Sequence, residues 1–62
     1  MKIIIDACDA GQGYFYVCAA LYVREGEFLR VLDTATRMTL REHIDIAVLA
    51  VTAELNPRTA AN

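Results

Sequence analysis

The sequence has 62 residues, which is the length of one small domain, and 56% of them are apolar. Its formal net charge of −2 argues against the basic surface that proteins binding nucleic acid or anionic membranes usually carry. A chain this short buries only about 60% of the surface that its unfolded form exposes, so part of the apolar surface is expected to lie against another chain.

The first two expected elements are strands joined by a loop. Residues 2–7 (KIIIDA) form a short isoleucine-rich strand, and residues 8–13 (CDAGQG) form a loop that lacks the lysine and hydroxyl residue of a phosphate-binding loop. Residues 14–24 form the longest strand. Its period of two places an aliphatic set on one face, Phe15, Val17, Ala19, Leu21 and Val23, and Tyr14, Tyr16 and Tyr22 on the other. The aliphatic face is the better partner for a helix.

A hairpin follows this strand. Gly26 can adopt the positive φ that a tight turn requires, so residues 27–34 are expected to return as an antiparallel strand. Two alternating sets could face the helix, and Leu29 with Val31 is the favoured one. Residues 35–38 are expected to be a connector.

The last element is a helix over about residues 40–55. Thr39 and Glu42 stand at the spacing of a capping box, which predicts where the helix starts. Asn56 followed by Pro57 predicts where it ends, because proline disfavours helical backbone in the residue before it. Residues 58–62 are expected to fray.

The sequence therefore predicts one α+β domain over residues 1–62, with a three-stranded antiparallel sheet and one C-terminal helix on one face (β-β-β-α). The other sheet face would carry the tyrosines and stay open, unless two copies pair in a homodimer. Asp6 interrupts the apolar run at the start, so no signal peptide is expected, and residues 14–23 are too short to span a membrane. A soluble, cytoplasmic protein is expected, with Cys8 and Cys18 as small buried or half-buried thiols.

The order of elements resembles the N-terminal half of the ribonuclease H-like fold. Asp6 near the end of the first strand and Glu42 at the start of the helix occupy the places of two carboxylates that hold magnesium in that family. The resemblance implies a reduced metal-dependent nuclease, in which Asp9 could supply a third ligand. The parallel strands and further carboxylates that complete the family's site are missing from this sequence.

The preferred interpretation is a small non-enzymatic interaction protein without a cofactor. In size and charge the chain is similar to phage-encoded inhibitors of bacterial defence, including anti-CRISPR proteins. Its partner is expected to be a protein with a basic, nucleic-acid-binding surface, met by carboxylates that mimic phosphates, with no direct contact to nucleic acid or membrane. The expected contacts are Glu25, Glu27, Asp33, Asp45, Tyr14, Tyr16 and Tyr22. A structural homodimer or antitoxin-like module is a further alternative.

Overall fold

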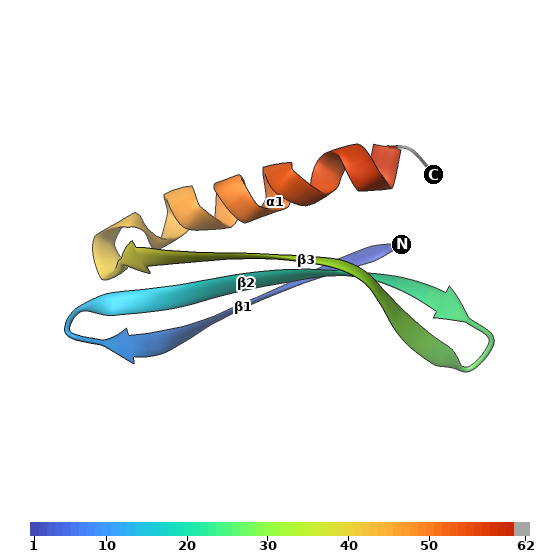
Figure 1. The fold of residues 1–62 in the computed structure, drawn as a ribbon, viewed down its shortest axis with the longest axis horizontal. Helices are drawn as coiled ribbons and strands as arrows, with labels where there is room; N and C mark the ends of the chain where they lie inside the picture. Colours follow the sequence, from blue (N-terminus) through green and yellow to red (C-terminus); the bar gives the residue numbers. More distant parts are fainter. Residues whose placement is uncertain (61–62) are drawn as a thin grey trace.

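The computed structural model describes residues 1–60, with side chains as far as residue 57. Three antiparallel strands in the order β1-β2-β3 form one sheet, and a single helix lies across one of its faces (Figure 1). The strands are β1 (Lys2–Gly11), β2 (Tyr14–Glu25) and β3 (Phe28–Leu40). A short 3-10 turn, η1 (Arg41–His43), leads into the helix α1 (Ile44–Ala60). The predicted α+β fold is therefore confirmed.

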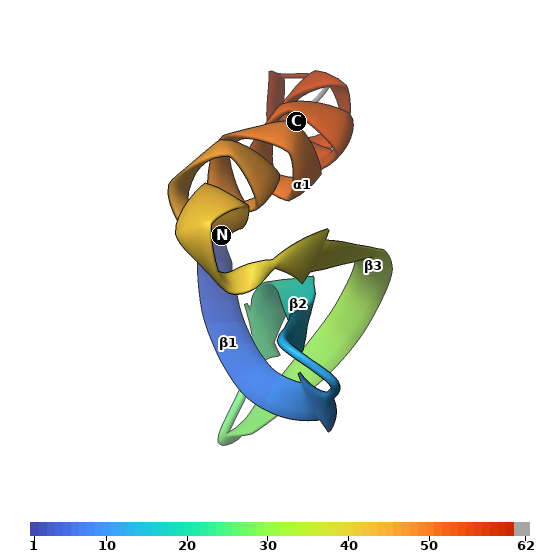
Figure 2. The ribbon, with the colours of Figure 1, turned by 90° about the vertical axis from the view of Figure 1, so that its left-hand side faces the viewer.

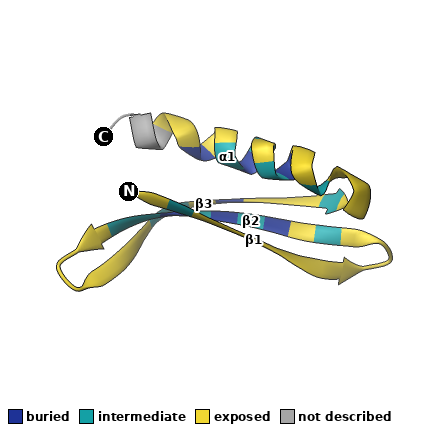
Figure 3. Ribbon diagram, turned by 180° about the vertical axis from the view of Figure 1, so that it is seen from behind, coloured by how far each residue is buried: buried dark blue, intermediate teal, exposed yellow. Residues whose placement is uncertain are grey.

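The core lies between α1 and the sheet. The helix packs mainly on β2 and β3, and it forms a second layer on one side of the strands (Figure 2). The aliphatic face of β2 points toward the helix, as predicted, and the buried positions of both layers face each other (Figure 3). The buried side chains are Val17, Ala19, Leu21, Ala35, Ala47, Val51 and Leu55. Because the helix lies on one face only, no other element of the described residues 1–60 covers the opposite face of the sheet.

Both edge strands are longer than the sequence predicted. The expected loop at residues 8–13 is largely strand, since Cys8 pairs with Tyr16 and Asp9 with Phe15. The expected connector at residues 35–38 is also strand. The central strand offers backbone hydrogen-bonding groups along both of its edges, so each neighbour continues for as long as it finds a partner. These two boundary predictions were wrong for that reason.

A bulge in β3 reverses which of its side chains face the helix. Leu21 pairs with Asp33 but Tyr22 pairs with Val31, so Leu32 is an extra residue in the register. A one-residue offset moves every following side chain to the other face. Leu32 packs against the core, whereas Leu29 and Val31 are exposed on the tyrosine side of the sheet. The expectation that Leu29 and Val31 face the helix was therefore wrong.

The helix also begins and ends later than predicted. Leu40 is the N-cap of η1 and makes no side-chain cap hydrogen bond, while Thr39 is still paired with Phe15 in the sheet. The predicted capping box does not form. At the other end α1 includes Pro57 and continues to Ala60, past the predicted end. Of the predicted frayed tail, residues 61–62 lie outside the described residues.

The outward side of the helix is apolar in places. Ile46 and Leu49 are exposed there, so the described residues cover the helix on one side only. Within the described residues, no helix combines the length and the apolar character needed to cross a membrane.

Candidate interaction surface on the uncovered sheet face

The sheet face opposite the helix, called here the uncovered face, carries a row of large side chains from the central strand. Tyr14, Tyr16 and Tyr22 alternate along β2 with the residues buried under the helix. The predicted orientation of the three tyrosines is therefore correct. Between Tyr16 and Tyr22, the side chains of Val17, Ala19 and Leu21 are buried under the helix and hold β2 in place.

Two cross-strand pairs at one end of the uncovered face form a continuous apolar surface. Tyr14 lies opposite Leu40, and Tyr16 lies opposite Met38. Directly opposite residues in an antiparallel pair have Cβ atoms about 4.5–5.5 Å apart, so their side chains touch or nearly touch. All four are exposed, Tyr14 by 42%, Tyr16 by 37%, Met38 by 56% and Leu40 by 38%. We call these four residues the tyrosine patch.

Sequence reasoning found half of this patch. Tyr14 and Tyr16 were predicted as contacts, but Met38 and Leu40 were assigned to a connector and to the start of the helix. The strand alternation of Thr34, Thr36, Met38 and Leu40 is the signal that would have found them. This alternation can be recognised only if residues 35–40 are assigned to the strand, and not to a connector and the start of the helix.

The predicted acidic contacts do not share this surface. Glu25 and Glu27 lie at the β2–β3 turn, and Asp45 lies in the first turn of α1, at the opposite end of the sheet (Figure 1). Asp33 sits in the middle of β3, opposite Leu21. The four predicted carboxylates are therefore spread over the molecule and form no single acidic surface.

Local hydrogen bonds account for several of these carboxylates. Asp33 Oδ1 accepts from the backbone N–H of Thr34 at 2.9 Å, and Asp45 Oδ1 accepts from that of Ile46 at 3.0 Å. Glu25 forms an ion pair with Arg30 at 2.7 Å. Glu27 makes no side-chain hydrogen bond or ion pair with any residue that the structure describes.

The alternative metal ligands are not brought together either. Asp6 pairs with Cys18 and Asp9 with Phe15, so the two aspartates belong to opposite faces of the sheet. Asp6 Oδ1 accepts from the N–H of Ala7 at 3.0 Å, and Asp9 Oδ1 accepts from that of Gly11 at 2.7 Å. Among the described residues, no three of His, Cys, Asp and Glu lie close enough to hold a metal ion. Asp6, Asp9 and Glu42 therefore do not form a metal site in this arrangement.

The two cysteines lie on the uncovered face and are both free thiols. Cys18 is half-buried, as expected, but Cys8 is exposed, so the prediction of a buried or half-buried thiol was wrong for that residue. Cys8 lies on the edge strand, opposite Tyr16, and so borders the tyrosine patch.

The comparisons with known proteins add no relative. The chain matches no protein-family model, no curated protein and no solved structure. The resemblances to the ribonuclease H-like fold and to anti-CRISPR inhibitors therefore stay predictions from the sequence.

Proposed function

We propose that this protein is a small non-enzymatic interaction protein that occupies a surface of a protein partner through its tyrosine patch. The observation that carries the proposal is the exposure of Tyr14, Tyr16, Met38 and Leu40 as two adjacent cross-strand pairs, on a face that no described element covers. A contiguous exposed apolar surface is unfavourable in water unless something covers it.

The chemistry of the patch favours a protein over a nucleic acid. Tyrosine and methionine are enriched where protein surfaces meet, since tyrosine supplies a large contact area with little rotamer entropy to lose. Bases also stack on tyrosine rings, but such platforms normally lie in a positive field. The four patch residues carry no charge, and the whole chain has a net charge of −2.

The packing of β2 behind the patch supports the same proposal. Tyr14 and Tyr16 flank Phe15 on β2, and Val17, the next residue, is completely buried under the helix. Side chains held on a packed strand lose less conformational freedom on binding than side chains on a mobile loop. An interaction protein with so few residues benefits from such preorganisation.

Site-specific photo-crosslinking tests this proposal. A photoreactive amino acid is placed at Met38 in the tyrosine patch and, as a matched control, at Leu49, an exposed apolar residue on the outer side of the helix. Both proteins are made in the cells that naturally produce the chain, irradiated, and their adducts identified by mass spectrometry. A discrete adduct with another protein at position 38, absent at position 49, supports the proposal.

Three results would contradict it. They are adducts of equal yield at both positions, no adduct at position 38, and an adduct at position 38 with a second copy of the chain only. One non-enzymatic interaction protein of this type would be an inhibitor of a bacterial defence system. If the captured partner belongs to a bacterial defence system, adding the purified chain should inhibit that system, and Tyr16→Ser should weaken the inhibition.

A further inference from the structure

The end of the β2–β3 hairpin projects beyond the rest of the sheet. The pairing of β1 with β2 stops at Lys2 and Tyr22, whereas β2 and β3 continue to Glu25 and Phe28. Figure 1 shows this end bending away from the helix. A two-stranded ribbon without a covering layer is marginally stable in water. Phe28 and Leu29 are nonetheless 76% and 52% exposed on it.

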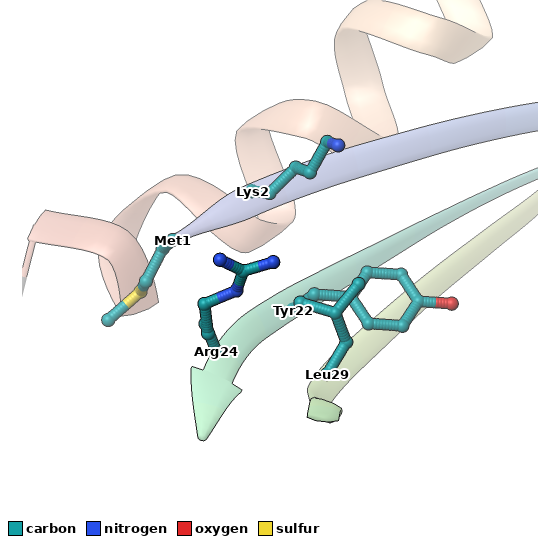
Figure 4. A pocket seen from close by; sticks show the side chains of 5 residues that line it. All are labelled: Met1, Lys2, Tyr22, Arg24 and Leu29. Atoms are coloured by element: carbon teal, nitrogen blue, oxygen red, sulfur yellow. The ribbon is translucent and has the colours of Figure 1, made fainter. Parts of the chain in front are cut away.

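A pocket of about 260 Å³ opens where this ribbon leaves the sheet, and Met1, Lys2, Tyr22, Arg24 and Leu29 line it (Figure 4). The guanidinium of Arg24 lies between Met1 and Tyr22, while the ammonium of Lys2 points away from it. Arg24 makes no ion pair or side-chain hydrogen bond with any described residue. A guanidinium fork beside apolar side chains is suited to bind a carboxylate in a bidentate manner.

A carboxylate of the required kind stands at the tip of the same hairpin. Glu27 lies in the turn, is exposed, and has no partner among the described residues, whereas its neighbour Glu25 is already paired with Arg30 at 2.7 Å. The chain therefore displays an unpaired cation and an unpaired anion at the same end of the hairpin, without joining them to each other. Such a surface is complementary to a second copy of itself.

We propose that two copies of the chain associate through their hairpin ends, with Glu27 of each copy binding Arg24 of the other. Arg24 and Leu29 are a cross-strand pair on the uncovered face. Strand residues advance about 3.3 Å each, so the turn lies only about 7–10 Å beyond that pair. In a dimer with two-fold symmetry, the uncovered faces of the two copies can overlap over about the last 7–10 Å of the hairpin. The turn of each copy then lies over the pocket of the other copy. The two Leu29 side chains then pack together near the axis.

The dimer leaves the tyrosine patches at its two outer ends. The patch lies at the β1–β2 turn end of the uncovered face and the pocket lies at the β2–β3 turn end. The association is therefore independent of the proposed function, and it would present two copies of the patch at once. A contact of five pocket residues per copy is small beside the roughly 20–30 residues a side of a standard interface, so the association is weak.

Sedimentation velocity with charge-reversal variants tests the proposal, at chain concentrations from about 10 μM to about 1 mM. Arg24→Glu and Glu27→Lys each place like charges together at both contacts of the dimer and should lower the association constant roughly tenfold or more. Mixing the two variants restores an opposite-charge pair at one contact and keeps the native pair at the other. The mixture should therefore associate at least as well as the wild-type chain.

Arg41→Glu and Glu42→Lys are the matched controls. They change the net charge by the same amounts, but they lie in η1 at the other end of the sheet and form no ion pair with a described residue. These controls, alone or mixed, should associate like the wild-type chain. A wild-type chain that stays monomeric at the highest concentration would overturn the proposal, as would a mixture that fails to recover or controls that weaken association equally. Thermal unfolding of each variant confirms that it is folded.

Discussion

Tyr16 and Met38 lie directly opposite each other on β2 and β3, on the sheet face that α1 does not cover. The residues that flank Tyr16 in sequence face the other way, toward the helix, so the central strand carries the core on one side and an exposed apolar surface on the other. The division follows from the period of two of a strand. It separates residues that pack in the core from residues that are exposed on the uncovered face.

This division predicts opposite results for substitutions on the two faces of the sheet. Leu21→Ala removes a fully buried side chain and should lower the free energy of unfolding by about 2–5 kcal/mol. Met38→Thr, on the uncovered face, should change it by no more than about 0.5 kcal/mol. Urea unfolding followed by circular dichroism measures both. A loss of more than about 2 kcal/mol for Met38→Thr would mean that the patch belongs to the core of this chain.

Pro57 provides a second prediction, because it lies inside α1 and has no N–H to donate to the carbonyl of Ala53. Pro57→Ala should restore that hydrogen bond and increase the helical signal. A gain of about 1 kcal/mol would raise Tm by about 4–8 °C in a domain of this size. The proline lies beyond Leu55, the last buried residue among the described side chains, so little packing is lost. A lower Tm would show that the proline ring contributes a contact of its own.

The ion pair between Arg37 and Glu54 joins β3 to α1 at 2.8 Å, with both side chains about half exposed. Exposed pairs usually contribute about 0.2–1 kcal/mol and are screened by salt. A double-mutant cycle with Arg37→Gln and Glu54→Gln should therefore give a coupling free energy in this range in dilute buffer. At 1 M salt, where the screening length is about 3 Å, the coupling should nearly vanish. A coupling above about 2 kcal/mol that resists salt would contradict this reading of the pair.

The sequence was most informative where one periodicity extends over a whole element. The alternation from Phe15 to Val23 identified the central strand and its helix-facing side, and the apolar spacing of residues 40–55 identified the helix. The predicted ends of the strands were wrong where pairing with a neighbouring strand overrides the local sequence signals. Gly11 and the segment before Leu40 resemble loops in isolation, yet β2 supplies a hydrogen-bonding partner to both.

The candidate site was harder to predict for two physical reasons. The bulge at Leu32 has no strong local signature, but it decides on which face Leu29 lies and hence whether the pocket exists. Surface charge is the second reason, because composition reports how many carboxylates a chain has and not where they point. The predicted contacts Glu25 and Asp45 are at opposite ends of the sheet. The tyrosines were assigned to the correct face because they alternate with apolar residues that face the helix, so they must lie on the opposite face of the sheet.

The central claim, that the tyrosine patch is the binding surface, is tested most directly by the affinity of matched lysine variants for the crosslinked partner. Met38→Lys places a charge in the patch, and Leu49→Lys places the same charge on an exposed apolar position of the helix. Isothermal titration calorimetry should show a Kd at least about tenfold weaker for Met38→Lys, because the charge loses hydration in the contact. Leu49→Lys should bind like the wild-type chain. Equal affinities for the two variants, or a loss confined to Leu49→Lys, would contradict the account.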